Sequence, residues 1–326
     1  MARVLSCIQP TGDVQLGNYL GAVRRWVDDQ TPESFHGIVD LHALTVPRPP
    51  EEMRQKTLEL AQILLAAGLD PSSTTLFVQS HVHEHTELGW ILECTAALGE
   101  LERMTQFKDK SAKQSGFISA GLLTYPALMA ADILLYDAEE VPVGDDQRQH
   151  VELTRDVAIR FNSRYGETFV IPKATIPPVG ARIMDLQNPT SKMSKSADSP
   201  QGTVLVLDDP KVIERKIKRA VTDTENEVRF DPDKKPGVAN LLQILSVCTG
   251  ETPATLADKY TQYGPLKTDT ASALIAFLQP VQQRYAELAA DPGHVRQVLA
   301  NGAAKAQSVA AVTLARAKAA LGLLPR

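Results

Sequence analysis

Cysteine and long apolar runs are scarce in this sequence. Only three cysteines occur among 326 residues, and they lie far apart with no CxxC pair, which argues against a zinc cluster or a disulfide framework. No apolar stretch reaches the roughly 18 residues that a membrane span needs, and the apolar part of the N-terminus is too short for a signal peptide. We therefore expect a cytoplasmic protein without a membrane partner, without zinc and without a metal site of its own.

An excess of positive charge is also absent. The formal net charge is -5, so the surface as a whole is no basic platform for DNA, and any polyanion has to be met by local clusters of lysine and arginine. Hydrophobic residues, by contrast, make up 43% of the chain. This content and this length predict a folded protein of about two domains.

Short apolar runs alternate with helical patterns in the first part of the chain. Residues 4–8, 35–41 and 74–78 are typical of buried strands, whereas residues 51–67 and 84–98 have helical periodicity. The alternation predicts an α/β fold with a doubly wound, Rossmann-like parallel sheet. Ligands of such a sheet bind beyond the carboxyl ends of its strands.

The rest of the chain is mainly helical. Residues 101–164 have helical patterns that are interrupted by a short run at 141–144, and helical periodicity resumes at residue 211 after a polar loop at 188–202. We expect a catalytic domain over residues 1–204 and an all-helical C-terminal domain over residues 205–326.

A first motif, PTGDVQLGN at residues 10–18, lies where the first strand passes into the first helix. Its glycines let the backbone approach a nucleotide closely, and the amino end of a helix offers unpaired N–H groups to phosphate. Gln9, Thr11 and Asn18 can add neutral donors. An ordinary turn followed by a helix cap explains the same pattern.

A second motif, KMSKS at residues 192–196, lies in the polar loop. Lys192 and Lys195, with Ser194 between them, suit a clamp on the negative charge that moves onto a departing pyrophosphate. A solvated basic loop is the alternative for an isolated match of five residues.

In this order the two motifs resemble the HIGH and KMSKS signatures of the class I aminoacyl-tRNA synthetases. The second match is complete. In the first, Gln15 stands where the family usually has His or Thr, and Asn18 replaces the final His. An amide donates hydrogen bonds but carries no charge, so a contact of Gln15 with ATP stays open.

A longer block between the signatures is similar to the tryptophanyl-tRNA synthetases. It consists of residues 125–136, YPALMAADILLY, followed by VPVGDDQ at 141–147 and by Gln149-His150. The resemblance runs from Ile8 to Ser196, includes Asp40 and His42, and weakens in the helical tail. It implies a ligase that uses ATP, as its complex with Mg²⁺, to join L-tryptophan to AMP and then to tRNA(Trp).

Asp132 lies in this otherwise apolar helical run, where an unpaired carboxylate is costly. Indole offers one N–H donor and no acceptor, so Asp132 can read it while Met129, Ile133, Val141 and Val143 surround the ring. Phenylalanine would leave the carboxylate unpaired, and sites of this kind reject such analogues by on the order of 10⁴-fold. Pairing of Asp132 with a neighbouring basic residue is the open alternative.

The resemblance implies further contacts that the residues alone do not establish. It gives Tyr125 and Gln147 to the amino group of tryptophan and Gln9 to its carboxylate region. Lys110, Lys192 and Lys195 are implied as phosphate ligands and therefore as the catalytic residues. The implied contacts with the rest of ATP are Thr11, Gly17, Asn18, Gly144, Asp146, Ile183 and Ser194.

Contacts with tRNA are less readable. Five basic residues shortly after the KMSKS motif fit either the tRNA backbone or a solvated helix face: Lys211, Arg215, Lys216, Lys218 and Arg219. In the family, the C-terminal helices read the anticodon and the enzyme is a homodimer. The resemblance therefore implies tRNA(Trp) and a second copy of the chain as partners.

Four histidines invite a metal site or a catalytic base. His81, His83 and His85 alternate near a strand end, and we interpret them as surface or loop residues because they lack a fixed carboxylate or cysteine partner. We expect His150 to pack against the wall of the active site.

Three other functions stay open. A tyrosyl-tRNA synthetase shares the fold and both signatures, and Asp132 is what favours tryptophan. A noncatalytic tRNA-binding paralogue is favoured only by Gln15 and opposed by the intact KMSKS motif. A small nucleotidyltransferase would not need the long helical tail.

Overall fold

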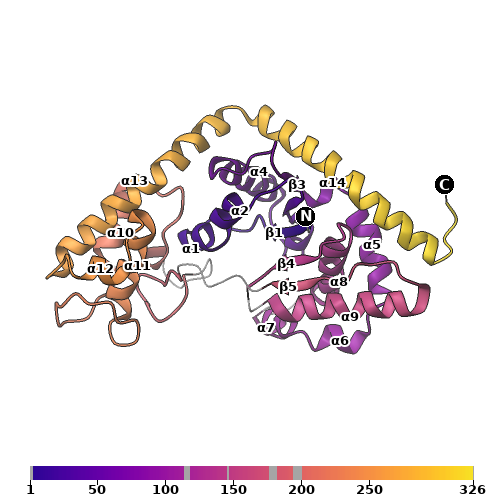
Figure 1. Ribbon diagram of the computed structural model, residues 1–326, viewed down its shortest axis with the longest axis horizontal. Coiled ribbons are helices and arrows are strands. Elements are labelled where there is room, and N and C mark those ends of the chain that lie inside the picture. The colour runs from indigo at the N-terminus through magenta and orange to yellow at the C-terminus, as the bar shows by residue number, and fades with distance from the viewer. Residues whose placement is uncertain (1–2, 114–117, 145–146, 176–181, 194–199, 326) are drawn as a thin grey trace.

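Five parallel strands form the central sheet of the computed structural model (Figure 1), which describes all residues except 1–2, 114–117, 145–146, 176–181, 194–199 and 326. The order across the sheet is β3-β2-β1-β4-β5. The register of the central pair runs from Val4 opposite Ser34 to Ile8 opposite Ile38. The strands are β1 (Val4–Ile8), β2 (Ser34–Ile38), β3 (Thr75–Val78), β4 (Glu140–Pro142) and β5 (Lys173–Thr175).

The direction in which strands are added reverses between β1 and β4. In a doubly wound sheet this switch point opens a crevice beyond the carboxyl ends of the two strands, where ligands bind. The predicted Rossmann-like fold is thus confirmed. The interpretation of residues 141–144 as a mere interruption between helices is wrong, because residues 140–142 form β4.

Helices cover both faces of the sheet, and the strands show why. Along β3, Leu76 and Val78 contribute to one apolar core and Phe77 to the other, as the alternation of side chains in a strand requires. The helices of this part are α1 (Leu16–Asn18), the π-helix η1 (Tyr19–Val23), α2 (Arg24–Asp28), α3 (Asp40–Ala43), α4 (Pro50–Ala66), the 3₁₀ helix η2 (Gln79–His81), α5 (Glu84–Glu93), α6 (Leu98–Glu102), α7 (Thr105–Lys113), α8 (Ala120–Leu134) and α9 (Arg148–Tyr165).

The C-terminal part is helical, as predicted. It begins after a 3₁₀ turn, η4 (Pro200–Gly202), and contains α10 (Pro210–Lys218), α11 (Pro236–Thr249), α12 (Pro253–Ala257), α13 (Tyr263–Ala290) and α14 (Pro292–Ala320). Helix α13 packs on α10, α11 and α4. In the described ranges, no helix combines the length and the apolar character that crossing a bilayer requires.

The last helix leaves this bundle and returns to the sheet. Figure 1 shows α13 and α14 forming an arch, with α14 running past β3 and α5. A Cβ atom at Gly302 would lie 1.8 Å from the carbonyl oxygen of Leu76, so only glycine permits this approach. Helix α14 thus packs on β3 and α5, in addition to the contact that α13 makes with α4.

Candidate active site

The loops that leave β1 and β4 meet at the switch point. Gln9 and Thr11 follow β1, and Val143 and Gly144 follow β4. Gly12 has a φ of 67°, a left-handed conformation that glycine adopts at little cost, and it allows the chain to turn directly after β1. The structure thus brings these predicted residues of the two loops to one edge of the sheet.

The first motif is joined directly to the second. Gln15 is 3% exposed; its Oε1 accepts a hydrogen bond from the Gly17 backbone N–H at 3.0 Å, and its Nε2 donates to the Met193 carbonyl at 2.7 Å. Residues 14–16 also pair with the backbone of residues 204–206, just beyond the second motif. Gln15 is therefore engaged with the protein on both sides of its amide.

The start of the second motif is held while its first lysine stays accessible. Met193 is 1% exposed and donates its backbone N–H to the Ile183 carbonyl at 3.1 Å. Lys192 is exposed, and its backbone forms an isolated antiparallel β-bridge with Met184. Ile183 itself is 1% exposed. The structure therefore brings Ile183, Lys192 and the first motif together.

The structure describes the remaining predicted ATP contacts only in part. Asn18 keeps a buried side-chain oxygen that has no partner among the described residues. Lys110 belongs to α7, where the position of its side chain is not described. Asp146, Ser194 and Lys195 lie outside the described residues.

Asp132 is buried on α8 and has protein partners. Only 2% of it is exposed. Its Oδ2 lies 2.6 Å from His42 Nε2, and its Oδ1 lies 2.7 Å from Gln79 Nε2 and 2.6 Å from His85 Nδ1. The described side chains thus show the alternative, in which Asp132 pairs with basic neighbours, while contact of this carboxylate with an indole stays a prediction. Contacts this short also leave no space for an ion between the carboxylate and either histidine.

The partners of Asp132 define the proton positions. An ionised carboxylate only accepts hydrogen bonds, so His42 Nε2 and His85 Nδ1 carry the protons that they share with it. His85 Nε2 then accepts from the Tyr136 hydroxyl, 2.8 Å away, when the ring is neutral. Burial alone would raise the pKa of Asp132, but the charge and hydrogen bond of His42, followed by those of His85, lower it to about 2.

The remaining residues of the proposed pocket come from the same helix and from β4. Tyr125, Ile133 and Val141 are buried, whereas Met129 and Val143 are half-buried. The Tyr125 hydroxyl lies 2.7 Å from His150 Nε2, and burial raises the pKa of Tyr125 to about 12. His150 is 1% exposed, so it packs inside the protein as expected. Gln147 is half-buried and directly precedes α9.

Two interpretations of basic residues need correction. His85 is no surface or loop residue: it is 1% exposed and lies on α5, although His81 and His83 are exposed. Lys216 is 5% exposed and donates to the Thr203 carbonyl and to Asp208, each at 2.7 Å, so it is not free to meet tRNA. The other four residues of that cluster are exposed.

Sequence reasoning missed Gln79, and it named Tyr136 without giving it a role. Gln79 follows β3, which is separated from β1 by β2, and it lies at the same edge of the sheet as the loop after β1. Its place directly after a buried strand was a signal that could have identified it.

Comparison with known proteins gives the same family along the whole chain. Residues 1–279 match the model of the class I tRNA synthetases for W and Y. A Streptomyces coelicolor protein named tryptophan–tRNA ligase 1 is 54% identical over 330 aligned residues, covering 100% of this chain and 98% of its own. The crystal structure of tryptophanyl-tRNA synthetase from Mycoplasma pneumoniae is similar, with a TM-score of 0.90 and 38% identity over 99% of this chain and 98% of that one. That of the Campylobacter jejuni enzyme complexed with ADP and tryptophan has a TM-score of 0.86 and 35% identity over 98% of this chain and 100% of that one.

Proposed function

This chain belongs to the tryptophanyl-tRNA synthetases of class I, and we propose that it activates L-tryptophan with ATP and then transfers the tryptophan to tRNA(Trp). The identity of 54% with a tryptophan–tRNA ligase over the whole length carries this proposal. The crevice expected at the switch point of the sheet supports it, because the first signature follows β1 there and Gln15 joins it to Met193 of the second signature.

ATP is proposed to bind at this crevice as its Mg²⁺ complex. The proposed contacts with adenosine and ribose are Gln9, Thr11, Gly17, Asn18, Gly144, Asp146 and Ile183. The side-chain oxygen of Asn18 supports this set, because a buried acceptor that has no donor among the described residues is suited to a ligand donor. Lys192, Lys195, Ser194 and Lys110 are proposed to contact the phosphates.

Tryptophan is proposed to place its indole N–H on Asp132. A carboxylate offers about four acceptor positions, and the described side chains use three, two on Oδ1 and one on Oδ2. Oδ2 thus keeps one position for the indole. Met129, Ile133, Val141 and Val143 are proposed to surround the ring, while Tyr125, Gln147 and Gln9 hold the amino acid end.

The protein partners of Asp132 strengthen this reading of selectivity. They keep the carboxylate ionised and fix its orientation before the substrate arrives, so the indole meets a preorganised acceptor. A phenylalanine ring brings no donor to the remaining position on Oδ2, which then stays buried and unpaired.

The chemistry needs no nucleophile from the protein. A carboxylate oxygen of tryptophan attacks the α-phosphorus of ATP; the bond from that phosphorus to the bridging oxygen breaks, and pyrophosphate leaves with Mg²⁺. A terminal ribose hydroxyl of tRNA then attacks the carbonyl carbon of the adenylate, loses its proton and releases AMP. The proposed lysines act by positioning and by stabilising the charge on the departing phosphates.

The macromolecular side of the proposal concerns residues 205–326, which we propose to be the anticodon-binding domain, with residues 1–204 as the catalytic domain. Exposed Lys211, Arg215, Lys218 and Arg219 on and next to α10 support contact with a polyanion. We also propose that the enzyme works in the cytoplasm, where its tRNA substrate is used.

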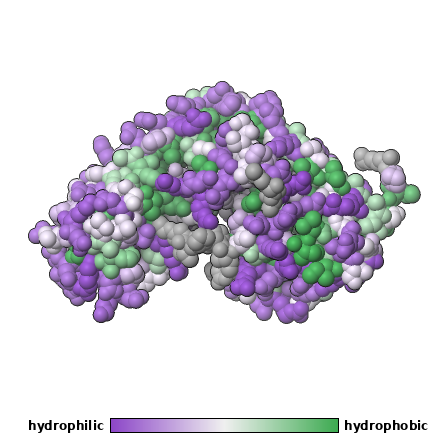
Figure 2. Space-filling view, in the orientation of Figure 1, coloured by the Kyte–Doolittle hydropathy of each residue, from purple (hydrophilic) through white to green (hydrophobic). Residues whose placement is uncertain are grey.

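We propose a homodimer because the family resemblance implies one, and exposed apolar residues on the surface support it. Trp90 on α5 is 67% exposed and Leu98 on α6 is 61% exposed. Figure 2 shows hydrophobic residues gathered on the half of the molecule that holds α5 and α9. Large exposed apolar side chains are typical of a subunit interface.

Exchange of labelled pyrophosphate into ATP, stimulated by each standard amino acid in turn, tests the function. Tryptophan is expected to stimulate exchange, with tyrosine and phenylalanine lower by on the order of 10⁴-fold. Stimulation by tyrosine alone would instead identify a tyrosyl-tRNA synthetase. Binding of ATP and tryptophan with no exchange would identify a noncatalytic paralogue.

A further inference from the structure

Gln15 belongs to the first signature, whose residues are expected near ATP, yet both ends of its side-chain amide are hydrogen-bonded to the protein backbone. It is 3% exposed. Its oxygen accepts the Gly17 N–H, and its nitrogen donates to the Met193 carbonyl. Both ends of the side chain therefore connect backbone to backbone, from the start of α1 to the middle of the KMSKS motif.

Gly17 is shaped to this arrangement. A Cβ atom at Gly17 would lie 2.9 Å from the Gln15 side-chain oxygen, closer than packed atoms approach. Glycine therefore leaves the space in which the Gln15 amide sits, and the two residues form one unit.

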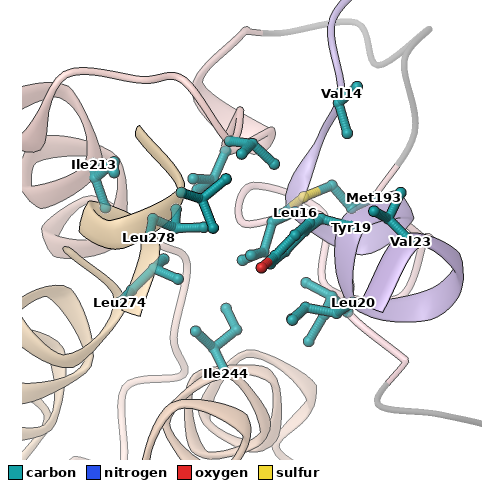
Figure 3. Packing of buried hydrophobic residues seen from close by; sticks show 14 of the residues in the cluster. Val14, Leu16, Tyr19, Leu20, Val23, Met193, Ile213, Ile244, Leu274 and Leu278 are labelled. Carbon is teal, nitrogen blue, oxygen red and sulfur yellow. The ribbon is translucent and has the colours of Figure 1, made fainter. Parts of the chain in front are cut away.

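Met193 is held on three sides. Its carbonyl accepts from Gln15, its N–H donates to the Ile183 carbonyl, and its side chain is 1% exposed. Figure 3 shows the Met193 side chain next to Leu16 and Tyr19 of the first motif. Lys192 directly precedes this anchored residue and remains exposed, so the direction in which Lys192 leaves the backbone depends on how Met193 is held.

We propose that Gln15 is a positioning residue that fixes Met193 relative to the first motif and thereby sets the place of Lys192, and that it makes no contact with ATP. This inference rests on the proposed role of Lys192 at the phosphates. It assigns a definite task to one of the two residues at which the first signature departs from its family.

The chemistry of the amide decides which replacements retain this role. A neutral histidine ring offers one donor and one acceptor, as Gln15 uses here. Glutamate keeps the acceptor for Gly17 but has no donor for Met193, and it sets a negative charge against that carbonyl. Threonine can reach the Gly17 N–H but is too short for Met193.

The test compares Gln15→Glu and Gln15→His in tryptophan-dependent pyrophosphate exchange. Gln15→Glu is expected to lower kcat by about 10- to 100-fold, since small displacements of catalytic groups cost this much, with the Kd for tryptophan unchanged by calorimetry. Gln15→His is expected to recover most of kcat. Gln62→Glu is the matched control, because Gln62 is another buried glutamine, 5% exposed, whose amide donates to a backbone carbonyl, that of Leu288, at 3.3 Å.

A double variant separates this inference from the role of Lys192. If Gln15 acts through Lys192, then Lys192→Ala slows exchange and adding Gln15→Glu slows it little further. Two results would overturn the inference alone: a double variant whose loss of rate is the product of the two single losses, or full activity of Gln15→Glu when Lys192→Ala is slow. Full activity of Lys192→Ala would overturn the phosphate role of that lysine, and the inference with it. Should thermal unfolding show that Gln15→Glu is not folded, Gln15→Met, which has similar size and no hydrogen bonds, replaces it with the same expected outcomes.

Discussion

Replacing Asp132 with alanine is expected to destabilise the folded protein as well as impair the selection of tryptophan. The carboxylate accepts hydrogen bonds from His42, Gln79 and His85, and all three are at most 5% exposed. Its removal leaves three buried donors unpaired, and each costs about 1–3 kcal/mol. The free energy of unfolding should therefore fall by about 3–9 kcal/mol, a large part of the 5–15 kcal/mol typical of a folded domain.

Asp132→Asn is the matched variant. It keeps Oδ1 as an acceptor for Gln79 and His85 but turns an NH₂ group toward His42, so the expected loss is about 1–3 kcal/mol. Urea unfolding followed by circular dichroism measures both losses, and amino-acid-dependent exchange measures the preference for tryptophan over phenylalanine. A loss below about 1 kcal/mol for Asp132→Ala would refute the reasoning about the buried donors, and unchanged rejection of phenylalanine would refute the role in selection.

Three further perturbations test other parts of the account. Lys195→Ala is expected to slow adenylate formation in single-turnover assays by far more than it weakens tryptophan binding, because the contact proposed for Lys195 with the departing phosphates would matter most as charge develops. Equal losses would contradict this proposal. Burial lowers the pKa of His36, which is 3% exposed, to about 4. The folded protein therefore favours the neutral ring, and the stability that this gives is complete above pH 6.5 and is lost as pH falls toward 4. His36→Phe should remove about 3 kcal/mol of this pH dependence from urea unfolding, and an unchanged dependence would contradict the reasoning. Gly302→Ala should lower the melting temperature because its Cβ would meet the Leu76 carbonyl, whereas Gly264→Ala, which meets nothing within 4 Å, should leave it equal or higher; equal effects would contradict the close docking of α14.

The sequence predicts the central strands and the family well because both depend on local patterns. Strand β1 coincides with its predicted residues 4–8. Strands β4 and β5 have three residues each, too few for a periodicity of two to be recognised, and their pairing is decided by distant neighbours. The predicted helix at 84–98 is too long, because α5 ends at Glu93 and the next helix, α6, begins only at Leu98.

The polar interior is harder to predict. His42, Gln79 and His85 are 90, 53 and 47 positions from Asp132 in the chain, so no local pattern reveals that they share one carboxylate. The burial of Lys216, by contrast, could have been predicted from its neighbours in the sequence.

Lys216 is buried on α10 together with Ile213, three residues before it, and Ile217, one residue after it. A basic residue on the apolar stripe of a helix is one that finds a buried partner, here Asp208.

The central claim is that Asp132 reads the indole N–H through the one acceptor position that its protein partners leave on Oδ2. A crystal structure of this protein with bound tryptophan tests it most directly. The account predicts an indole nitrogen within about 3 Å of Asp132 Oδ2, with the contacts to His42, Gln79 and His85 retained. An indole ring lodged elsewhere, or one whose N–H meets a different acceptor, would contradict it.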